Sequence, residues 1–209
     1  MDKSLAKPPT KRRRRTKPKP LVYINSQSNK RKLNPNKFNH TRDGTFRIYP
    51  MRADGNCLFR AMAYYVLGNQ KENGFVRHLI AGHISRNFSK YIDFIGEERA
   101  IYLQRMYQAG EYGGHIEILA FTEIFGCAVN IYHQDHPDDS PLRVGSASEA
   151  LPLIYSGITD SGHYNVLLPL STSNLDVESH KDYIRRLRES SCRRFDNNMK
   201  NFKVLEKTR

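Results

Sequence analysis

Cys57 occupies the position in this 209-residue chain that is best suited to nucleophilic chemistry. It follows Gly55 and Asn56, which favour a turn, and it begins a run of apolar residues at helical spacing. At the first turn of a helix, unpaired backbone N–H groups and the helix dipole favour a thiolate over a thiol. The backbone N–H groups of Asn56 and Cys57 are also predicted to stabilise an oxyanion beside the sulfur.

A cysteine nucleophile needs a histidine to exchange its proton and a third group to orient the imidazole ring. His163 is the best candidate among eight histidines, because it begins a predicted strand and is expected to face a cleft at the sheet edge. Two residues compete for the third role. Asn165 shares a strand face with His163, and Asp54 lies three residues before Cys57. Either side chain can accept the ring N–H, and both alternatives stay open.

Helical and alternating patterns predict the elements that position these residues. Apolar residues recur at helical spacing in four segments, and β-branched residues alternate in three later segments. Helices followed by strands indicate the α+β class, with helices packed against a small sheet. The predicted helices span 57–67, 73–87, 97–109 and about 116–124, and the predicted strands span 127–132, 151–155 and 163–168.

The formal net charge of +13 resides in the first 42 residues, which hold 14 Lys or Arg and one acid. Residues 1–44 are rich in proline and poor in apolar side chains, so we predict a basic disordered arm. Residues 1–42 are expected to contact nucleic acid or a nuclear-import receptor, with a merely solubilising tail as the alternative. Residues 45–170 are the predicted catalytic domain, and 171–209 a basic C-terminal helix and tail, the helix over 177–191.

The cysteine pattern and hydropathy limit the class of protein. Cys57, Cys127 and Cys192 cannot all pair with one another, and no Cys-x-x-Cys or His-x-x-x-His cluster suggests zinc. The chain shows no signal-peptide pattern and no apolar run of membrane length. We therefore expect an intracellular protein, nuclear or cytoplasmic, that uses no metal or cofactor and does not enter a membrane.

Three motifs together resemble those of the ovarian tumour (OTU) family of cysteine deubiquitinases. The nucleophile motif of the family is similar to residues 54–61, its middle motif to residues 112–120, and its histidine motif to residues 163–166. They occur in the family's order, and the resemblance covers about residues 46–170. It implies a papain-like α+β fold that cleaves ubiquitin from lysine side chains without a metal.

The resemblance also implies a role for each matching residue. Cys57 corresponds to the nucleophile, His163 to the general base and Asp54 to the acidic residue of the nucleophile motif. Asn165 corresponds to the position where many members place the residue that orients the histidine. Tyr112 departs from the tryptophan that is common at its position, which concerns packing and not chemistry.

Ubiquitin or polyubiquitin is the partner that the resemblance implies. Because the recognition face of ubiquitin is basic, Glu111, Glu117 and Asp160 are candidate substrate-binding acids, although exposed acids are usually only solvated. Two alternatives remain beside the cysteine isopeptidase. One is an inactive OTU-fold module that binds ubiquitin or acts as a scaffold, and the other is a nucleic-acid-associated protein that uses its basic arm.

Overall fold

The structure is a computed structural model, and all the residues that it describes belong to one unit, Leu33–Arg209. Within the chain, the described residues are 38–157, 162–169, 182–187 and 189. The first 37 residues of the predicted basic arm, Asp160 and most of the predicted C-terminal helix and tail lie outside them.

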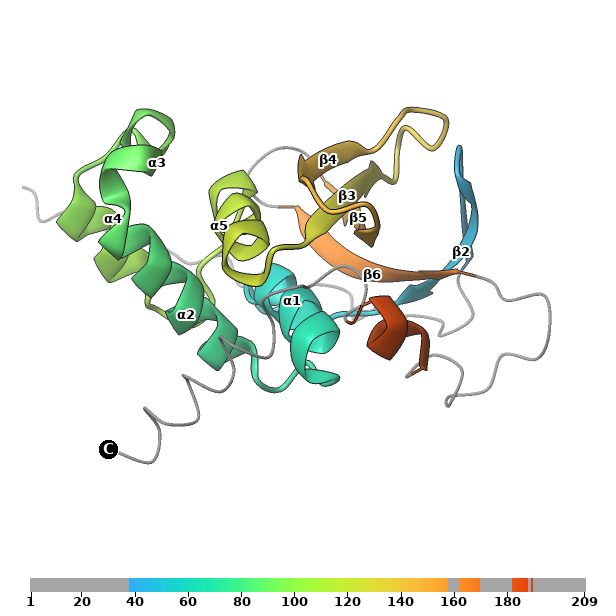
Figure 1. Ribbon diagram of the computed structural model, residues 1–209, viewed down its shortest axis with the longest axis horizontal. Coiled ribbons are helices and arrows are strands. Elements are labelled where there is room, and N and C mark those ends of the chain that lie inside the picture. The colour runs from blue at the N-terminus through green and yellow to red at the C-terminus, as the bar shows by residue number, and fades with distance from the viewer. Residues whose placement is uncertain (1–37, 158–161, 170–181, 188, 190–209) are drawn as a thin grey trace, which may run out of the picture. The chain divides into compact units, whose positions relative to one another are not determined.

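The described residues form one six-stranded sheet with the strand order β1-β2-β6-β5-β3-β4. All neighbouring strands run antiparallel except β3 and β5, which run parallel (Figure 1). The strands are β1 (Phe38–Thr41), β2 (Gly44–Tyr49), β3 (Ala128–His133), β4 (Leu142–Gly145), β5 (Ala150–Ser156) and β6 (His163–Pro169). The predicted strands 127–132, 151–155 and 163–168 are thus confirmed as β3, β5 and β6.

The pairing of β6 explains why its first residues are available to a site. β2 pairs with β6 only from Val166 to Pro169, opposite Tyr49 to Phe46. His163 therefore lies beyond the end of β2, next to the chain that leads from β2 into the nucleophile loop. On its other side, β6 pairs with β5 along its first four residues, which holds this end of the strand in place.

Helices lie beside the sheet, and most of them match the predicted segments. The helix at 57–67 is confirmed to the residue, and the helix at 73–87 ends one residue earlier than predicted. Residues 182–187, within the predicted C-terminal helix, are also helical. The helices before the last strands are α1 (Cys57–Leu67), α2 (Asn73–Arg86), α3 (Phe88–Ile95), α4 (Arg99–Met106) and α5 (His115–Phe125).

The helix predicted over 97–109 corresponds to α4, which ends earlier than predicted, at Met106. A further helical turn would pair the N–H of Gly110 with the carbonyl of Met106. Side chains take both groups instead: Gly110 N donates to Asn56 Oδ1 (2.9 Å), and Met106 O accepts from Arg77 (3.2 Å). Contacts from distant parts of the chain therefore end this helix, and its own composition does not show them.

Three strands and one helix are not among the predicted elements. β1 lies inside the predicted arm 1–44, so that residues 38–44 belong to the sheet and the boundary at 45 is wrong. β1 contains little apolar material and is held by backbone pairing with β2 across a two-residue turn, Arg42-Asp43. β4 is a short edge strand, and α3 exposes most of its surface, since Tyr91 alone is buried among its eight residues.

The hydrophobic core gathers around α1, where nine of the eleven residues are buried. α1 contacts β6 on one side and α2 on another, and α2 in turn contacts α5 (Figure 1). A smaller apolar cluster, with Ile48 and Leu167, lies on the other face of the sheet. Because α1 is enclosed on several sides, Cys57 at its first position is held against β6.

Candidate active site

Cys57 lies at the first position of α1 and is almost covered, with 3% of its surface exposed. Its Sγ lies 3.5 Å from the backbone N of Tyr164, the residue after His163. Burial raises the pKa of the Cys57 thiol, and the charge of Asp54 adds to this effect. The N–H groups of Tyr164, Leu58 and Cys57 itself act in the opposite direction, because they stabilise a thiolate. Before substrate binds, the sulfur is therefore a thiol, with three backbone N–H donors near it.

His163 is oriented by Asn165, whose Oδ1 lies 3.0 Å from His163 Nε2. The same oxygen accepts the backbone N–H of Met51 at 2.8 Å, so the atom between them must be the amide oxygen. Nε2 therefore carries a proton and donates it, which leaves Nδ1 as the basic nitrogen. Burial lowers the pKa of His163 below 6.5, so the ring is neutral at neutral pH and able to accept a proton.

Asp54 contacts Arg60 and not the histidine ring. Its two oxygens accept from Arg60 Nε (3.1 Å) and Arg60 Nη2 (2.5 Å), and Oδ1 also accepts the backbone N–H of Asn56 (3.1 Å). The hydrogen bond from Arg60 is the largest cause of the lowered pKa of Asp54. Of the two candidates for the third group, the structure places Asn165 on the ring and Asp54 on the loop.

The backbone of Asn56 is engaged, which corrects one of the predicted oxyanion donors. Its N–H donates to Asp54 Oδ1, so it is not directed at the sulfur. A carboxylate three residues before the nucleophile competes for loop N–H groups, and the prediction overlooked that competition. The N–H groups of Cys57 and Leu58 do approach the sulfur, as the first donors of α1.

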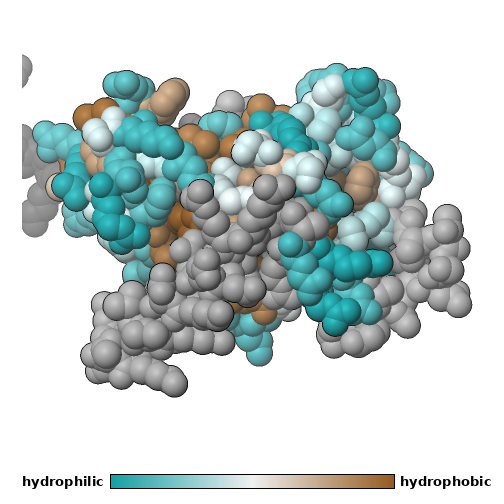
Figure 2. Space-filling model, viewed as in Figure 1, coloured by the Kyte–Doolittle hydropathy of each residue, from teal (hydrophilic) through white to brown (hydrophobic). Residues whose placement is uncertain are grey.

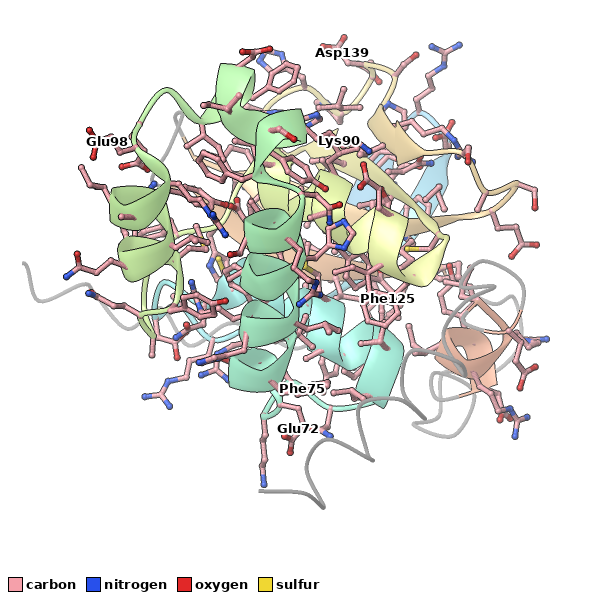
Figure 3. All side chains as sticks on the ribbon, turned by 60° about the vertical axis from the view of Figure 1, so that its left-hand side comes forward. Glu72, Phe75, Lys90, Glu98, Phe125 and Asp139 are labelled. Atoms are coloured by element: carbon pink, nitrogen blue, oxygen red, sulfur yellow. The ribbon has the colours of Figure 1, made fainter. Side chains whose placement is uncertain are left out.

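Two residues that the sequence analysis missed hold the nucleophile loop in place. Arg77 donates to Asn56 Oδ1 at 2.8 Å, and Gly110 approaches so closely that a Cβ on Gly55 would lie 1.8 Å from its carbonyl oxygen. Figure 3 looks onto α2, which carries Arg77 and extends from the labelled Phe75 towards Lys90 on α3. A signal did exist for Arg77: it lies three and seven positions before two buried isoleucines, on the apolar stripe of its helix.

A cleft of about 690 Å³ is lined by residues next to the catalytic pair, Gly162 and Tyr164 on either side of His163. Tyr164, whose N–H faces Cys57, is one of its walls, and Gly113 and Gly114 form another. Gly113 packs on the Phe59 ring, where a Cβ would approach within 2.8 Å. The cleft therefore ends beside the first turn of α1, and its walls of backbone and aromatic rings suit an extended chain.

The predicted substrate-binding acids have different positions. Glu117 is buried: it accepts from the Tyr102 hydroxyl and from the N–H of Gly114 (2.5 Å), so it fixes the start of α5 and is not a surface acid. The prediction treated it as exposed because a capping position was not recognised. Glu111 lines the cleft but pairs with Arg105, and Asp160 lies outside the described residues.

The part of the chain that the structure describes holds no group of three or more His, Cys, Asp or Glu side chains close enough to bind a metal ion. Over the same residues, no helix has the length and apolar character needed to cross a membrane. Cys127, like Cys57, is buried and forms no disulfide among the described residues.

A cysteine at a helix start, beside a strand whose histidine is bound to an asparagine, defines the site of a papain-like cysteine protease on an α+β fold. Residues 52–164 match the family model described as OTU-like cysteine protease. This match covers more than half of the 209 residues, and the chain belongs to the OTU family. The predicted family and fold are thereby confirmed.

Curated relatives resemble part of the chain. It is 30% identical over 125 residues to the OVARIAN TUMOR DOMAIN-containing deubiquitinating enzyme 6 of Arabidopsis thaliana, across 59% of this chain and 24% of that protein. It is 32% identical over 87 residues to OTU domain-containing protein 5 of Homo sapiens, across 42% of this chain and 15% of that protein. The chain thus spans about a quarter or less of the length of these relatives.

Solved structures of OTU domains have the same fold. The Hazara virus OTU, solved bound to ubiquitin, has a TM-score of 0.54 at 23% identity, over 66% of this chain and 89% of that chain. An Ovarian Tumor (OTU) domain in complex with ubiquitin has a TM-score of 0.52 at 17% identity, over 76% and 94%. At these identities the likeness establishes the fold alone.

Proposed function

We propose that this chain is a deubiquitinating cysteine isopeptidase, which hydrolyses the bond between the C-terminus of ubiquitin and a lysine side chain. The observation that carries the proposal is the geometry around His163. Asn165 Oδ1 accepts the hydrogen bond of His163 Nε2, which leaves Nδ1 as the basic nitrogen. The next residue of the strand, Tyr164, contacts Cys57 Sγ through its backbone N–H. The Arabidopsis thaliana relative named a deubiquitinating enzyme, and the OTU structures solved with ubiquitin, support the choice of substrate.

In the proposed mechanism, Cys57 and His163 exchange one proton in each half of the reaction. His163 Nδ1 accepts the thiol proton while Sγ bonds to the carbonyl carbon of the last glycine of ubiquitin. The oxyanion that forms is stabilised by the N–H of Cys57. When the C–N bond breaks, His163 passes the proton to the lysine amine, and a thioester remains.

Hydrolysis of the thioester reverses these roles. Water gives a proton to His163 and bonds to the thioester carbon, and the C–S bond then breaks. Cys57 recovers a proton, and ubiquitin leaves with a free carboxylate. Asn165 keeps its hydrogen bond to Nε2 throughout, so that the ring does not rotate between the two halves.

The cleft beside Cys57 is the proposed path of the ubiquitin C-terminal tail. Its far end includes Phe94, which is 74% exposed, and Ile92 and Ile101 are also exposed on α3 and α4. Figure 2 shows hydrophobic surface at this end of the molecule among hydrophilic residues. An exposed apolar patch next to a narrow cleft fits a folded modifier with an extended tail.

Hydrolysis of ubiquitin–aminomethylcoumarin and of di-ubiquitin tests the proposal, with Cys57→Ala and Cys127→Ser as a matched pair. Activity in wild type and in Cys127→Ser, together with its loss in Cys57→Ala, is the expected result. Binding of ubiquitin without hydrolysis by the folded wild type would favour the inactive binding module instead.

A further inference from the structure

Arg77, on α2, is buried beneath the nucleophile loop with 1% of its surface exposed. Its Nη2 donates to Asn56 Oδ1 (2.8 Å) and to the carbonyl of Glu111 (2.6 Å), and its Nη1 donates to the carbonyl of Met106 (3.2 Å). The guanidinium carbon lies 3.9 Å from the centre of the Phe59 ring. Among the described residues, every acceptor of these hydrogen bonds is uncharged.

These contacts join three parts of the chain. Asn56 belongs to the loop before Cys57, while Met106 and Glu111 lie at either end of the turn that follows α4. Gly110, in that turn, donates to the same oxygen of Asn56 as Arg77 does. Arg77 and Asn56 together therefore hold the nucleophile loop and the wall of the cleft at a fixed separation.

The charge of Arg77 also matters, because a buried charge without a directly bound carboxylate acts strongly on its neighbours. Burial lowers the pKa of Arg77 to about 10, so it remains protonated at neutral pH. The negative charges of Glu111, Glu117 and Asp54 raise the pKa of Arg77, and the thiolate form of Cys57 does so to a smaller extent. Arg77 is hydrogen-bonded to Asn56, the residue directly before Cys57, so its positive charge is held close to the start of α1. A positive charge there opposes the effect of burial, which disfavours the thiolate.

We propose that Arg77 is a positioning residue for Cys57: it holds the nucleophile loop through Asn56 and supplies a buried positive charge that favours the thiolate. This inference rests on the proposed function in that Cys57 is taken as the nucleophile. Arg77 itself touches neither the sulfur nor the cleft. Its effect reaches the reaction through Asn56 and through the electric field.

The test separates Arg77 from the surrounding titratable groups by measuring Cys57 itself. Tyr164 on β6 and Asp54 in the loop interact with Cys57, and His163 lies one residue before Tyr164 on the same strand. Glu111 and Glu117 interact with Arg77. Iodoacetamide alkylation of the Cys57 peptide, followed by mass spectrometry across a pH series, reports the apparent pKa of the thiol without ubiquitin. The result is therefore readable even if the protein does not hydrolyse ubiquitin.

Arg77→Met keeps the bulk of the side chain and removes its donors and charge, and Arg77→Lys restores the charge with fewer donors. We expect Arg77→Met to raise the midpoint of the alkylation profile by about one pH unit, and Arg77→Lys to lie nearer wild type. With a ubiquitin substrate, kcat should fall about tenfold or more in Arg77→Met with little change in KM. Arg86→Met, the same change at an exposed arginine of α2, should leave the alkylation profile unchanged.

Thermal unfolding of each variant establishes that it is folded before its profile is compared. A folded Arg77→Met with the wild-type alkylation midpoint would overturn the proposal. If Arg77→Met does not fold, Arg77→Lys decides the question. A wild-type alkylation midpoint with a reduced kcat would support both the electrostatic role and the role in holding the loop. A wild-type kcat would overturn the proposal. Loss of folding in both variants would also overturn it, because Arg77 would then serve the core and not the site.

Discussion

Asn165 Oδ1 accepts two hydrogen bonds from donors on opposite sides of the site, Met51 and His163, and Met51 is 114 residues away in sequence. We expect Asn165→Ala to lower kcat/KM by roughly ten- to a thousandfold, because the histidine remains but its ring is no longer oriented. Hydrolysis of ubiquitin–aminomethylcoumarin measures the loss. An unchanged kcat/KM would show that Asn165 is not the orienting residue.

Asp54 provides the contrasting case. Because it holds Arg60 and the N–H of Asn56, we expect Asp54→Ala to lower both activity and the thermal midpoint. The two measurements must be made on the same preparation. If Asp54→Ala kept its thermal midpoint and lost as much activity as His163→Ala, Asp54 would act on the histidine and the assignment would be reversed.

The lowered pKa of His163 sets the acid limb of the pH profile. Burial favours the neutral ring, and only the neutral ring accepts the thiol proton, so activity should fall in acid at a pH below that at which an ordinary histidine titrates. The hydrogen bond to Asn165 raises the pKa of His163, since it stabilises the charged ring. Asn165→Ala should therefore move the acid limb to still lower pH, as measured by kcat/KM across the acid range.

At the scale of elements, the nucleophile loop and the turn after α4 pack backbone to backbone. Gly55 has φ 76°, and a Cβ there would lie 1.8 Å from the carbonyl oxygen of Gly110. We expect Gly55→Ala to abolish labelling of Cys57 by a ubiquitin C-terminal electrophile, because the loop must shift. Gly68 is the matched control: it has φ 75° at the end of α1, with no atom within 4 Å of the added Cβ.

Gly68→Ala meets only the strain of a left-handed backbone, which costs about 1 kcal/mol of unfolding free energy. Cys57 in this variant should react normally with the ubiquitin electrophile, and the variant should unfold at a slightly lower temperature. Equal labelling of both variants would mean that the contact between Gly55 and Gly110 does not hold the site.

The elements that the sequence predicted are those whose own residues show the pattern. α1 is confirmed to the residue because its apolar positions and its flanking Gly68 act locally. β1 was missed because its pairing with β2 is a backbone contact that leaves little trace in composition. The choice between Asn165 and Asp54 stayed open for a similar reason. It depends on where Arg60 and Met51 point, and only the folded chain brings them there.

At the scale of the whole molecule, the basic arm and the sheet meet at β1. The hairpin turn beside β1 is tied to the far side of the sheet, since Arg42 N donates to the carbonyl of Pro137 and Asp43 accepts from the Tyr132 hydroxyl. A shortened chain beginning at Phe38 should keep the thermal midpoint and the hydrolysis of a ubiquitin substrate. A chain beginning at Thr45 should unfold on the order of 5 °C lower, because it lacks these contacts.

The same two shortened chains test the proposed role of the arm. Both lack most of the positive charge of the protein, so both should lose binding to a polyanion at low salt and accumulate less in the nucleus than the full chain. Undiminished polyanion binding by the chain beginning at Phe38 would place that property in the folded part. Equal stability of the two chains would show that β1 adds nothing to the sheet.

Asn56 and Arg77 bind each other, and each also binds the turn after α4, so these contacts restrict which connections can vary in length. Gly110 N must reach Asn56, and the carbonyl of Glu111 must reach Arg77, so one residue added or removed in this connection would displace both. The connection between β3 and β4 carries no such ties to the nucleophile loop among the described residues. Insertions between β3 and β4 should therefore leave the nucleophile loop in place, at the expense of the contact between Arg42 and Pro137, whereas insertions between α4 and α5 should disrupt the site.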